Sequence, residues 1–317
     1  MTYLEALAFG MRAFGIAPPP ETSKNWYLPY QKIADSNHIL ATHSYTLSTK
    51  IMRGKAAELV ENLQKYQTSQ TVLSYGSKGC SSASKTLGTQ NTIMIDGAAR
   101  KYNLYVPSGY SSNKQYNLIV ALHGRTNSND MVQGYMGLQG RTGGWGSSAG
   151  TVQSDTIVAY PAGVSVAGGY SWSDYSNIKF FDAILEQLSD NYCISRDQVF
   201  IVGHSLGGWF SNRLACVRGD VLRGMTAVAG PGYSGNCTGP VASLLFHNQK
   251  DLLVSYTSGK NAEAIRKTVN QCSNTISKEV TIGSLKCKEW QNCSTGNPVV
   301  WCEGYSTYQN DPHSWPI

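Results

Sequence analysis

The sequence predicts an α/β fold with a mostly parallel central sheet, preceded by a small helical region at the N-terminus. Two observations carry this prediction. From residue 91 onward, short apolar runs typical of buried strands alternate with amphipathic helical segments. One of these runs, residues 198–202, leads through a glycine-rich turn directly into a helix. Because such sheets carry their sites at the carboxyl ends of the strands, we expect the functional residues at one edge.

The composition is typical of an extracellular protein that faces carbohydrate. Hydrophobic residues make up 41% of the 317 residues and charged residues only 15%, while Ser, Thr, Asn, Gly and Tyr are abundant. The formal net charge is +6, but Lys and Arg are scattered without a basic run, which argues against nucleic-acid binding. No stretch reaches the ~18 apolar residues of a membrane span. The first residues lack the pattern of a signal peptide, so we expect Met1 to be an artificial start or a cut within a longer precursor.

The eight cysteines favour disulfides over a metal site. No C-x-x-C pair occurs, and the histidines are not spaced near the cysteines as zinc ligands would be. An even number of cysteines in such a chain indicates an oxidising compartment. Because four bridges allow 105 pairings, counting alone does not determine the connectivity.

Residues 1–66 differ from the remainder, because they lack cysteine and their apolar spacing predicts helices. Within this region, residues 25–30 and 50–59 resemble one S-layer homology repeat, and residues 1–15 resemble the tail of a preceding repeat. Such repeats hold proteins to cell-wall polymer, so the resemblance implies a wall anchor. Two alternatives to a wall anchor are a helical cap packed on the following domain and a lid over the site of that domain.

A Ser-, Thr- and Gly-rich connection over residues 67–90 is expected to be a linker, followed by a catalytic domain over residues 91–317. The pattern predicts helices over residues 177–190 and 258–269. Strands are expected at residues 93–95, 102–106, 117–122, 156–160, 198–202, 223–229, 242–246 and 299–303.

The turn after the strand at residues 198–202 is Gly203-His204-Ser205-Leu206-Gly207. It matches the G-x-S-x-G nucleophile elbow of the α/β-hydrolase fold, in the strand–turn–helix context that the motif requires. The two glycines let strand and helix pass each other closely, while the serine takes a strained backbone conformation. The motif therefore predicts an α/β-hydrolase fold with Ser205 as the nucleophile.

A serine hydroxyl needs a base to take its proton, and the hydrolase fold supplies the acid and then the histidine downstream. Two histidines follow Ser205 in the chain, His247 and His313. His247 precedes the acid candidate, so its place in the chain order is wrong for the base. His313 lies in a loop after the last predicted strand, and we expect it to be the base.

The acid is expected four residues after a strand, at Asp251. Asp220 follows the nucleophile helix too closely in the chain to be the acid. Asp311 is two residues from His313, and we interpret it as a solvated turn residue. Glu303 is a weaker competitor. The sequence therefore predicts a triad in which Asp251 holds the histidine for the serine.

Two backbone N–H groups are expected to hold the oxyanion. One belongs to Leu206, which follows the nucleophile, and the other to Arg125, in a loop where Gly124 allows close approach of the backbone. His123 is expected to brace that loop. Trp172 and Tyr135 are aromatic residues expected at the carboxyl edge, where they could stack on a phenolic acyl group or a sugar; ordinary packing is the alternative for both.

Several separate motifs together resemble carbohydrate esterase family one, which includes feruloyl esterases, acetylxylan esterases and the related polyhydroxybutyrate depolymerases. The chain departs from the family in having Asn248 where a glycine follows the histidine, and in ending four residues past His313. The motifs lie at residues 122–126, 169–172, 180–182, 192–193, 203–208, 214–216, 247–251 and 313–316.

This resemblance implies the triad Ser205, Asp251 and His313, with Arg125 and Leu206 at the oxyanion hole. It also implies disulfides, which are Cys193–Cys216, Cys80–Cys237, Cys272–Cys302 and Cys287–Cys293.

The implied function is that of a secreted serine esterase acting on feruloyl or acetyl esters of plant polysaccharide, with neither metal nor organic cofactor. A polyester depolymerase on the same fold, acting on polyhydroxybutyrate or an aromatic polyester such as PET, is an alternative substrate class. From a different class, the chain could be a wall-anchored adhesin with an inactive hydrolase fold. A peptidase is possible in principle, although nothing in the sequence favours amides.

Overall fold

The computed structural model divides the chain into two compact units, Met1–Tyr75 and Gly76–Ile317. It describes residues 76–81, 87–138, 155–282, 285–304 and 311–313, all in the second unit. The helices and the S-layer homology-like repeat predicted within residues 1–66 lie outside the described residues and stay predictions.

The second unit begins earlier than the sequence indicates. Gly76 forms a β-bridge with Ser195, and Gly79 donates from its N–H to the carbonyl of Ser189 at 2.9 Å. Residues 87–90 lead into the first strand of the sheet. The predicted linker over residues 67–90 is therefore wrong at residues 76–81 and 87–90, because the chain there is held by hydrogen bonds that composition does not reveal.

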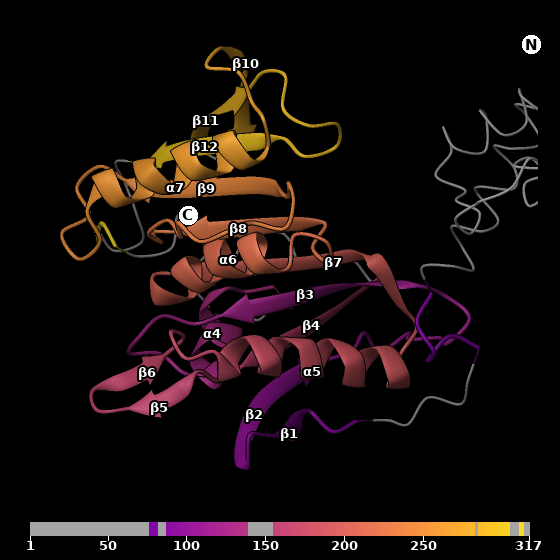
Figure 1. Ribbon diagram of the computed structural model, residues 1–317. Helices are drawn as coiled ribbons and strands as arrows, with labels where there is room; N and C mark the ends of the chain where they lie inside the picture. The colour runs from indigo at the N-terminus through magenta and orange to yellow at the C-terminus, as the bar shows by residue number, and fades with distance from the viewer. Residues whose placement is uncertain (1–75, 82–86, 139–154, 283–284, 305–310, 314–317) are drawn as a thin grey trace, which may run out of the picture. The chain divides into compact units, whose positions relative to one another are not determined.

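A ten-stranded sheet in the order β1-β2-β4-β3-β7-β8-β9-β12-β11-β10 forms the centre of the described part (Figure 1). Its middle, from β4 to β12, is parallel, and an antiparallel pair closes each end. The strands are Gln90–Ile95 (β1), Ala98–Tyr105 (β2), Tyr116–Leu122 (β3), Thr156–Pro161 (β4), Ile194–His204 (β7), Gly224–Val228 (β8), Ala242–Asn248 (β9), Ile276–Ile282 (β10), Leu285–Trp290 (β11) and Val299–Gly304 (β12).

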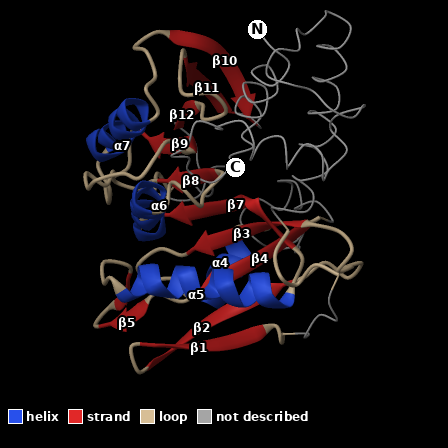
Figure 2. Cartoon of the chain, turned by 45° about the vertical axis from the view of Figure 1, so that its right-hand side comes forward, coloured by secondary structure: helices blue, strands red, loops and turns tan. Residues whose placement is uncertain are grey.

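Helices cover both faces of this sheet (Figures 1 and 2). The helices α5 (Ser176–Asn191), α6 (Leu206–Val217) and α7 (Tyr256–Val269) lie on one face, and α4 (Asn129–Tyr135) lies on the other. Alternate side chains of β3 enter different cores: Val120 packs in the cluster that contains α5 and α6, and Ala121 packs with α4. The predicted α/β fold and its mostly parallel sheet are confirmed.

The helices and strands that the sequence does not predict are those whose apolar residues show no clear helical or strand spacing. A small hairpin of β5 (Val164–Val166) and β6 (Gly169–Ser171) was not expected, nor were α4, β10 and β11. The hairpin is short and only partly buried, and α4 has only seven residues. No helix in the described ranges is both long and apolar enough to cross a membrane.

All eight cysteines form disulfides, but in none of the four implied pairings, so that part of the resemblance is wrong. The bonds are Cys80–Cys193, Cys216–Cys237, Cys272–Cys293 and Cys287–Cys302.

Backbone neighbours explain these pairings. Cys287 and Cys302 stand directly opposite each other in the antiparallel pair of β11 and β12. Thr238, next to Cys237, donates from its N–H to the carbonyl of Cys216 at 2.8 Å. The sequence pattern predicts neither β11 nor a place in the sheet unit for the segment before β1, so it does not indicate that these cysteines meet.

Candidate active site

The nucleophile elbow forms as predicted between β7 and α6. Ser205 has a φ of 56° and a ψ of −122°, in the left-handed region that costs a residue with a side chain about 1–3 kcal/mol. A Cβ on Gly203 would overlap the carbonyl oxygen of Gly207, and a Cβ on Gly207 would overlap that of Leu122. Both glycines are therefore required by close backbone approach, and the strained serine is held between them.

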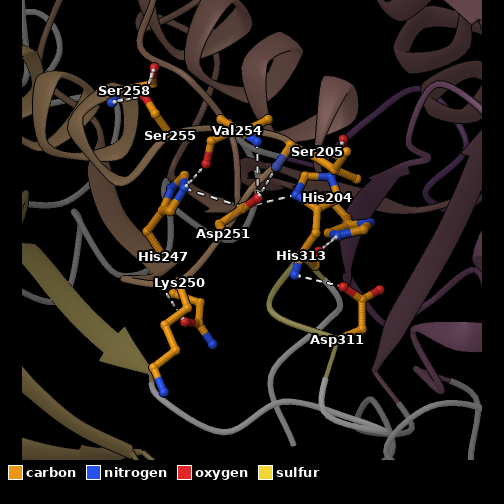
Figure 3. Close-up of polar contacts among 12 residues, drawn as sticks. His204, Ser205, His247, Lys250, Asp251, Val254, Ser255, Ser258, Asp311 and His313 are labelled. Atoms are coloured by element: carbon orange, nitrogen blue, oxygen red, sulfur yellow. Dashed lines mark hydrogen bonds and ion pairs between the residues drawn. The ribbon is translucent and has the colours of Figure 1, made fainter.

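The structure brings together the three residues predicted as a triad (Figure 3). Ser205 Oγ lies 2.8 Å from His313 Nε2, and His313 Nδ1 lies 2.8 Å from Asp251 Oδ2. The three residues come from the end of β7, the loop after β12 and the loop after β9. Because a carboxylate only accepts, His313 Nδ1 carries a proton and Nε2 faces the serine hydroxyl as an acceptor.

Asp251 is held as an anion by several donors. Its Oδ1 accepts from the N–H groups of Leu253 and Val254, each at 2.9 Å, and its Oδ2 lies 3.4 Å from His247 Nε2. Burial raises the pKa of this carboxyl, but the hydrogen bonds from His247, His313 and Val254 outweigh burial and hold the pKa well below its usual value. His247 therefore supports the acid, in keeping with the prediction that it is not the base.

Two of the other acid candidates, Glu303 and Asp311, are engaged elsewhere. Glu303 accepts from the indole N–H of Trp301 at 2.9 Å and from the side-chain amide of Gln249 at 2.7 Å. Asp311 accepts from the backbone N–H of His313 at 3.0 Å, so it shapes the loop that presents the histidine.

The loop predicted to supply an oxyanion donor lies against the nucleophile. A Cβ on Gly124 would stand 3.3 Å from the Cβ of Ser205, so only glycine leaves room for an ester carbonyl between them. Within the described residues, no acceptor hydrogen-bonds to the N–H of Arg125 or of Leu206. Two backbone donors beside a serine hydroxyl are the arrangement that stabilises a tetrahedral oxyanion.

His123 braces this loop, as predicted. Its Nε2 accepts from the N–H of Gly163 at 3.0 Å, so Nδ1 carries the proton and donates to the carbonyl of Gly124 at 2.7 Å. Burial lowers the pKa of His123 to about 4, which keeps the ring neutral and this pair of hydrogen bonds intact.

The described residues contain no group of three or more His, Cys, Asp or Glu side chains that could hold a metal ion.

Comparison with known proteins identifies the chemistry. No family model matches the chain. Feruloyl esterase D of Neurospora crassa is 30% identical over 235 residues, which are 71% of this chain and 79% of that protein. Feruloyl esterase C of Emericella nidulans is 29% identical over 205 residues, 62% of this chain and 70% of that protein. The chain belongs to the feruloyl esterase family. It is a carboxylic ester hydrolase, and the alternative of an inactive adhesin is set aside.

Solved structures share the fold of this esterase. An acetyl xylan esterase from Aspergillus awamori has a TM-score of 0.52 at 14% identity, and the match covers 73% of this chain and 96% of that one. A ferulic acid esterase from Anaeromyces mucronatus has a TM-score of 0.50 at 17% identity over 77% of this chain and 90% of that one. At these identities the likeness shows the α/β-hydrolase fold.

The two aromatic residues predicted to bind substrate are buried in the esterase. Trp172 is 1% exposed, stacks on Phe210 and donates from Nε1 to the carbonyl of His123 at 2.9 Å. Tyr135 is 7% exposed and lies edge-on to His204, with ring centroids 5.9 Å apart. The prediction that their faces stack on substrate is wrong, because both rings are buried against other side chains, Trp172 against Phe210 and Tyr135 at the end of α4 against His204.

Sequence reasoning missed His204, although it stands beside the nucleophile in the motif. Its Nε2 lies 2.6 Å from the carbonyl oxygen of His313, and since a carbonyl only accepts, His204 donates this hydrogen bond (Figure 3). Burial lowers the pKa of His204 to about 4, so the ring is neutral at pH 7. The residue before the nucleophile thus fixes the backbone of the residue that faces it.

Two of the buried histidines, His123 and His204, are expected to make stability depend on pH between about 4 and 6.5. Each has a folded pKa near 4 and an unfolded pKa of 6.5, so in this window the unfolded chain binds more protons than the folded one. The free energy of unfolding therefore falls as the pH falls, by up to about 3 kcal/mol for each histidine. Urea unfolding at pH 6.5 and pH 4.5 measures this slope. His204→Gln, which keeps a donor without a titrating ring, is expected to reduce it; an unchanged slope would contradict the assignment.

Proposed function

We propose that this esterase cleaves feruloyl esters of plant polysaccharide through a covalent intermediate on Ser205. The observation that carries the proposal is the pair of 2.8 Å hydrogen bonds that joins Ser205, His313 and Asp251 at a nucleophile elbow. The substrate class rests on the relatives, which are feruloyl esterases by name.

In the proposed mechanism, Ser205 Oγ attacks the ester carbonyl carbon and its proton passes to His313 Nε2. Asp251 stabilises the imidazolium through Nδ1, while the N–H groups of Arg125 and Leu206 hold the negative oxygen of the tetrahedral intermediate. The carbon–oxygen bond to the alcohol then breaks, and the alcohol leaves with the proton from His313. Water, deprotonated by His313, attacks the acyl-enzyme, and the acid departs as Ser205 regains its proton.

Secretion is part of the proposal. Four disulfides are formed in a chain whose catalytic unit is large enough to fold without them, which is typical of an oxidising compartment. Plant polysaccharide also lies outside the cell, so an esterase that acts on it has to be secreted to reach its substrate.

The first test is hydrolysis of methyl ferulate beside p-nitrophenyl acetate. The esterase is expected to turn over both, and to release ferulate from feruloylated arabinoxylan. Turnover of the acetate without methyl ferulate would contradict the feruloyl assignment and favour acetyl esters. Ester hydrolysis without labelling by a serine-directed organophosphate would contradict the covalent mechanism.

One observation favours a polyester as a second candidate substrate. Leu252 and Leu253, directly after Asp251, are 93% and 77% exposed. Exposed apolar side chains beside a hydrolytic site suit contact with a hydrophobic polymer surface. Soluble product released from amorphous aromatic polyester film or from polyhydroxybutyrate, at a rate comparable with ferulate release, would support this candidate.

A further inference from the structure

A polar pocket lies on the face of the sheet that α4 partly covers. Its volume is about 810 Å³, within the ~300–1,000 Å³ typical of ligand pockets. The lining comes from β1 and β2, from residues 128–130 at the start of α4, and from residues 162–165 with Tyr170. The proposed acyl transfer gives this pocket no part.

Strand alternation explains why the floor of the pocket is polar. Thr92 pairs with Lys101 and Gln90 pairs with Asn103 across β1 and β2, so these four side chains share one face of the hairpin. The intervening residues point to the opposite face, where Tyr102 hydrogen-bonds to α5 through Gln187. Side chains on one face of the β1–β2 hairpin are thus buried under α5, and those on the other face line the pocket.

The polar groups of this floor are held in place. Asn103, only 4% exposed, donates to Asp130 Oδ1 at 2.7 Å and to Gln133 Oε1 at 3.0 Å, and its own oxygen accepts from Asn129 Nδ2 at 2.8 Å. Amides and a carboxylate fixed in this way are suited to pair with hydroxyl groups. Lys101 and Asp130 bring opposite charges to the lining. The third charged residue of the lining, Arg100, turns its guanidinium towards α5, where it donates to Asn177 Oδ1 at 2.8 Å and lies over the Phe180 ring. The lining therefore favours a neutral polyhydroxyl ligand over an anion or an apolar acyl group.

The pocket is connected to the ester-cleaving site by hydrogen bonds. Tyr170 donates from its N–H to the carbonyl of Arg125 at 2.8 Å, and Gly163 donates to the ring of His123. The Tyr170 ring lies edge-on to His123, with centroids 4.8 Å apart. Two residues of the pocket wall therefore touch the loop that carries a proposed oxyanion donor.

We propose that this pocket binds neutral sugar residues of the polysaccharide that carries the ester. The half-buried Tyr170 offers a ring against which the apolar face of a sugar can pack, and the fixed amides and Asp130 pair with its hydroxyls. This inference rests on the proposed function, since it assigns a saccharide subsite whose wall hydrogen-bonds to the loop of Arg125.

Direct binding tests the pocket without any catalytic turnover. Xylotetraose, which carries no ester, is titrated into the full-length chain and followed by calorimetry. Saturable binding is expected, and Thr92→Trp, which fills the floor from an exposed strand position, is expected to weaken it at least about tenfold. Met94→Trp is the matched control, because Met94 shares the strand and the face with Thr92 but does not line the pocket. No saturable binding by the unmodified chain, or equal binding by both variants, would overturn the inference.

Kinetics then separate this inference from the proposed function. Thr92→Trp is expected to raise KM for a feruloylated arabinoxylan oligosaccharide while its kcat/KM for methyl ferulate stays that of the unmodified esterase. Equal KM values of the two proteins on the oligosaccharide would overturn the saccharide subsite and leave the esterase assignment standing. Failure of the unmodified chain to cleave methyl ferulate would instead count against the proposed function. The xylotetraose titration would still test whether the pocket binds sugar.

Discussion

Ser205→Ala is expected to lower kcat for methyl ferulate by about five to six orders of magnitude, the scale seen when a serine hydrolase loses its nucleophile. The hydroxyl is the atom that faces His313 Nε2 at 2.8 Å, and alanine leaves that base with nothing to deprotonate. KM is expected to change little, because binding of the acyl and sugar groups does not use the hydroxyl. Turnover rates together with circular dichroism of the folded variant measure the effect.

Asp251→Asn is expected to lower kcat by about 10⁴-fold, since an amide no longer fixes the tautomer of the histidine. Its nitrogen would also face N–H donors that now meet a carboxylate. Asp96→Asn is the matched control, because Asp96 pairs with Lys179 on the surface and is expected to retain full activity. Retention of more than about a tenth of the activity by Asp251→Asn would indicate that another acid orients His313.

The positions of Ser205, Asp251 and His313 could be predicted because the hydrolase fold fixes their order along the chain. A strand, a glycine-flanked turn and a helix are local features, and each later residue follows a recognisable strand. The geometry between them is not local. His204 donates to a residue 109 positions away, and a contact of that kind leaves no periodicity in the sequence.

The two aromatic residues show where residue type misleads. Trp172 and Tyr135 lie in segments next to the site, as predicted, but both rings point into the packing beneath the loops. Large aromatic side chains contribute most to stability when they are buried, and a buried Trp finds an acceptor for its N–H, here the carbonyl of His123. Sequence can place an aromatic residue near a site, but which way its ring points depends on the loops around it.

The disulfides could not be paired from sequence because bonding depends on the approach of segments that the sequence separates. Cys80 lies before the first strand and Cys193 lies directly before β7, 113 residues later. Their approach follows from Ser77, whose hydroxyl accepts from the N–H of Ile194 at 2.8 Å. Short polar segments such as this one resemble linkers until their hydrogen bonds are known.

Replacing both Cys80 and Cys193 by alanine is expected to lower the free energy of unfolding by about 5 kcal/mol, on the chain-entropy relation for a loop of this length. The bond closes a loop of 113 residues, so its loss releases more freedom in the unfolded chain than the loss of any other disulfide here. Urea unfolding followed by near-ultraviolet circular dichroism measures the change.

Replacing both Cys216 and Cys237 by alanine is the matched comparison. This bond also joins a buried cysteine to a half-buried one, but it closes only 21 residues, for which the same relation gives about 3 kcal/mol. A difference of about 1.5 kcal/mol between the two variants is therefore expected from loop length alone. Equal losses would mean that local packing, rather than chain entropy, sets the contribution of each bond. Cys193 directly precedes β7 and Ser205 directly follows it, so the disulfide and the nucleophile lie at opposite ends of this strand of 11 residues. The Cys80 and Cys193 variant is therefore expected to keep its kcat at temperatures where it stays folded.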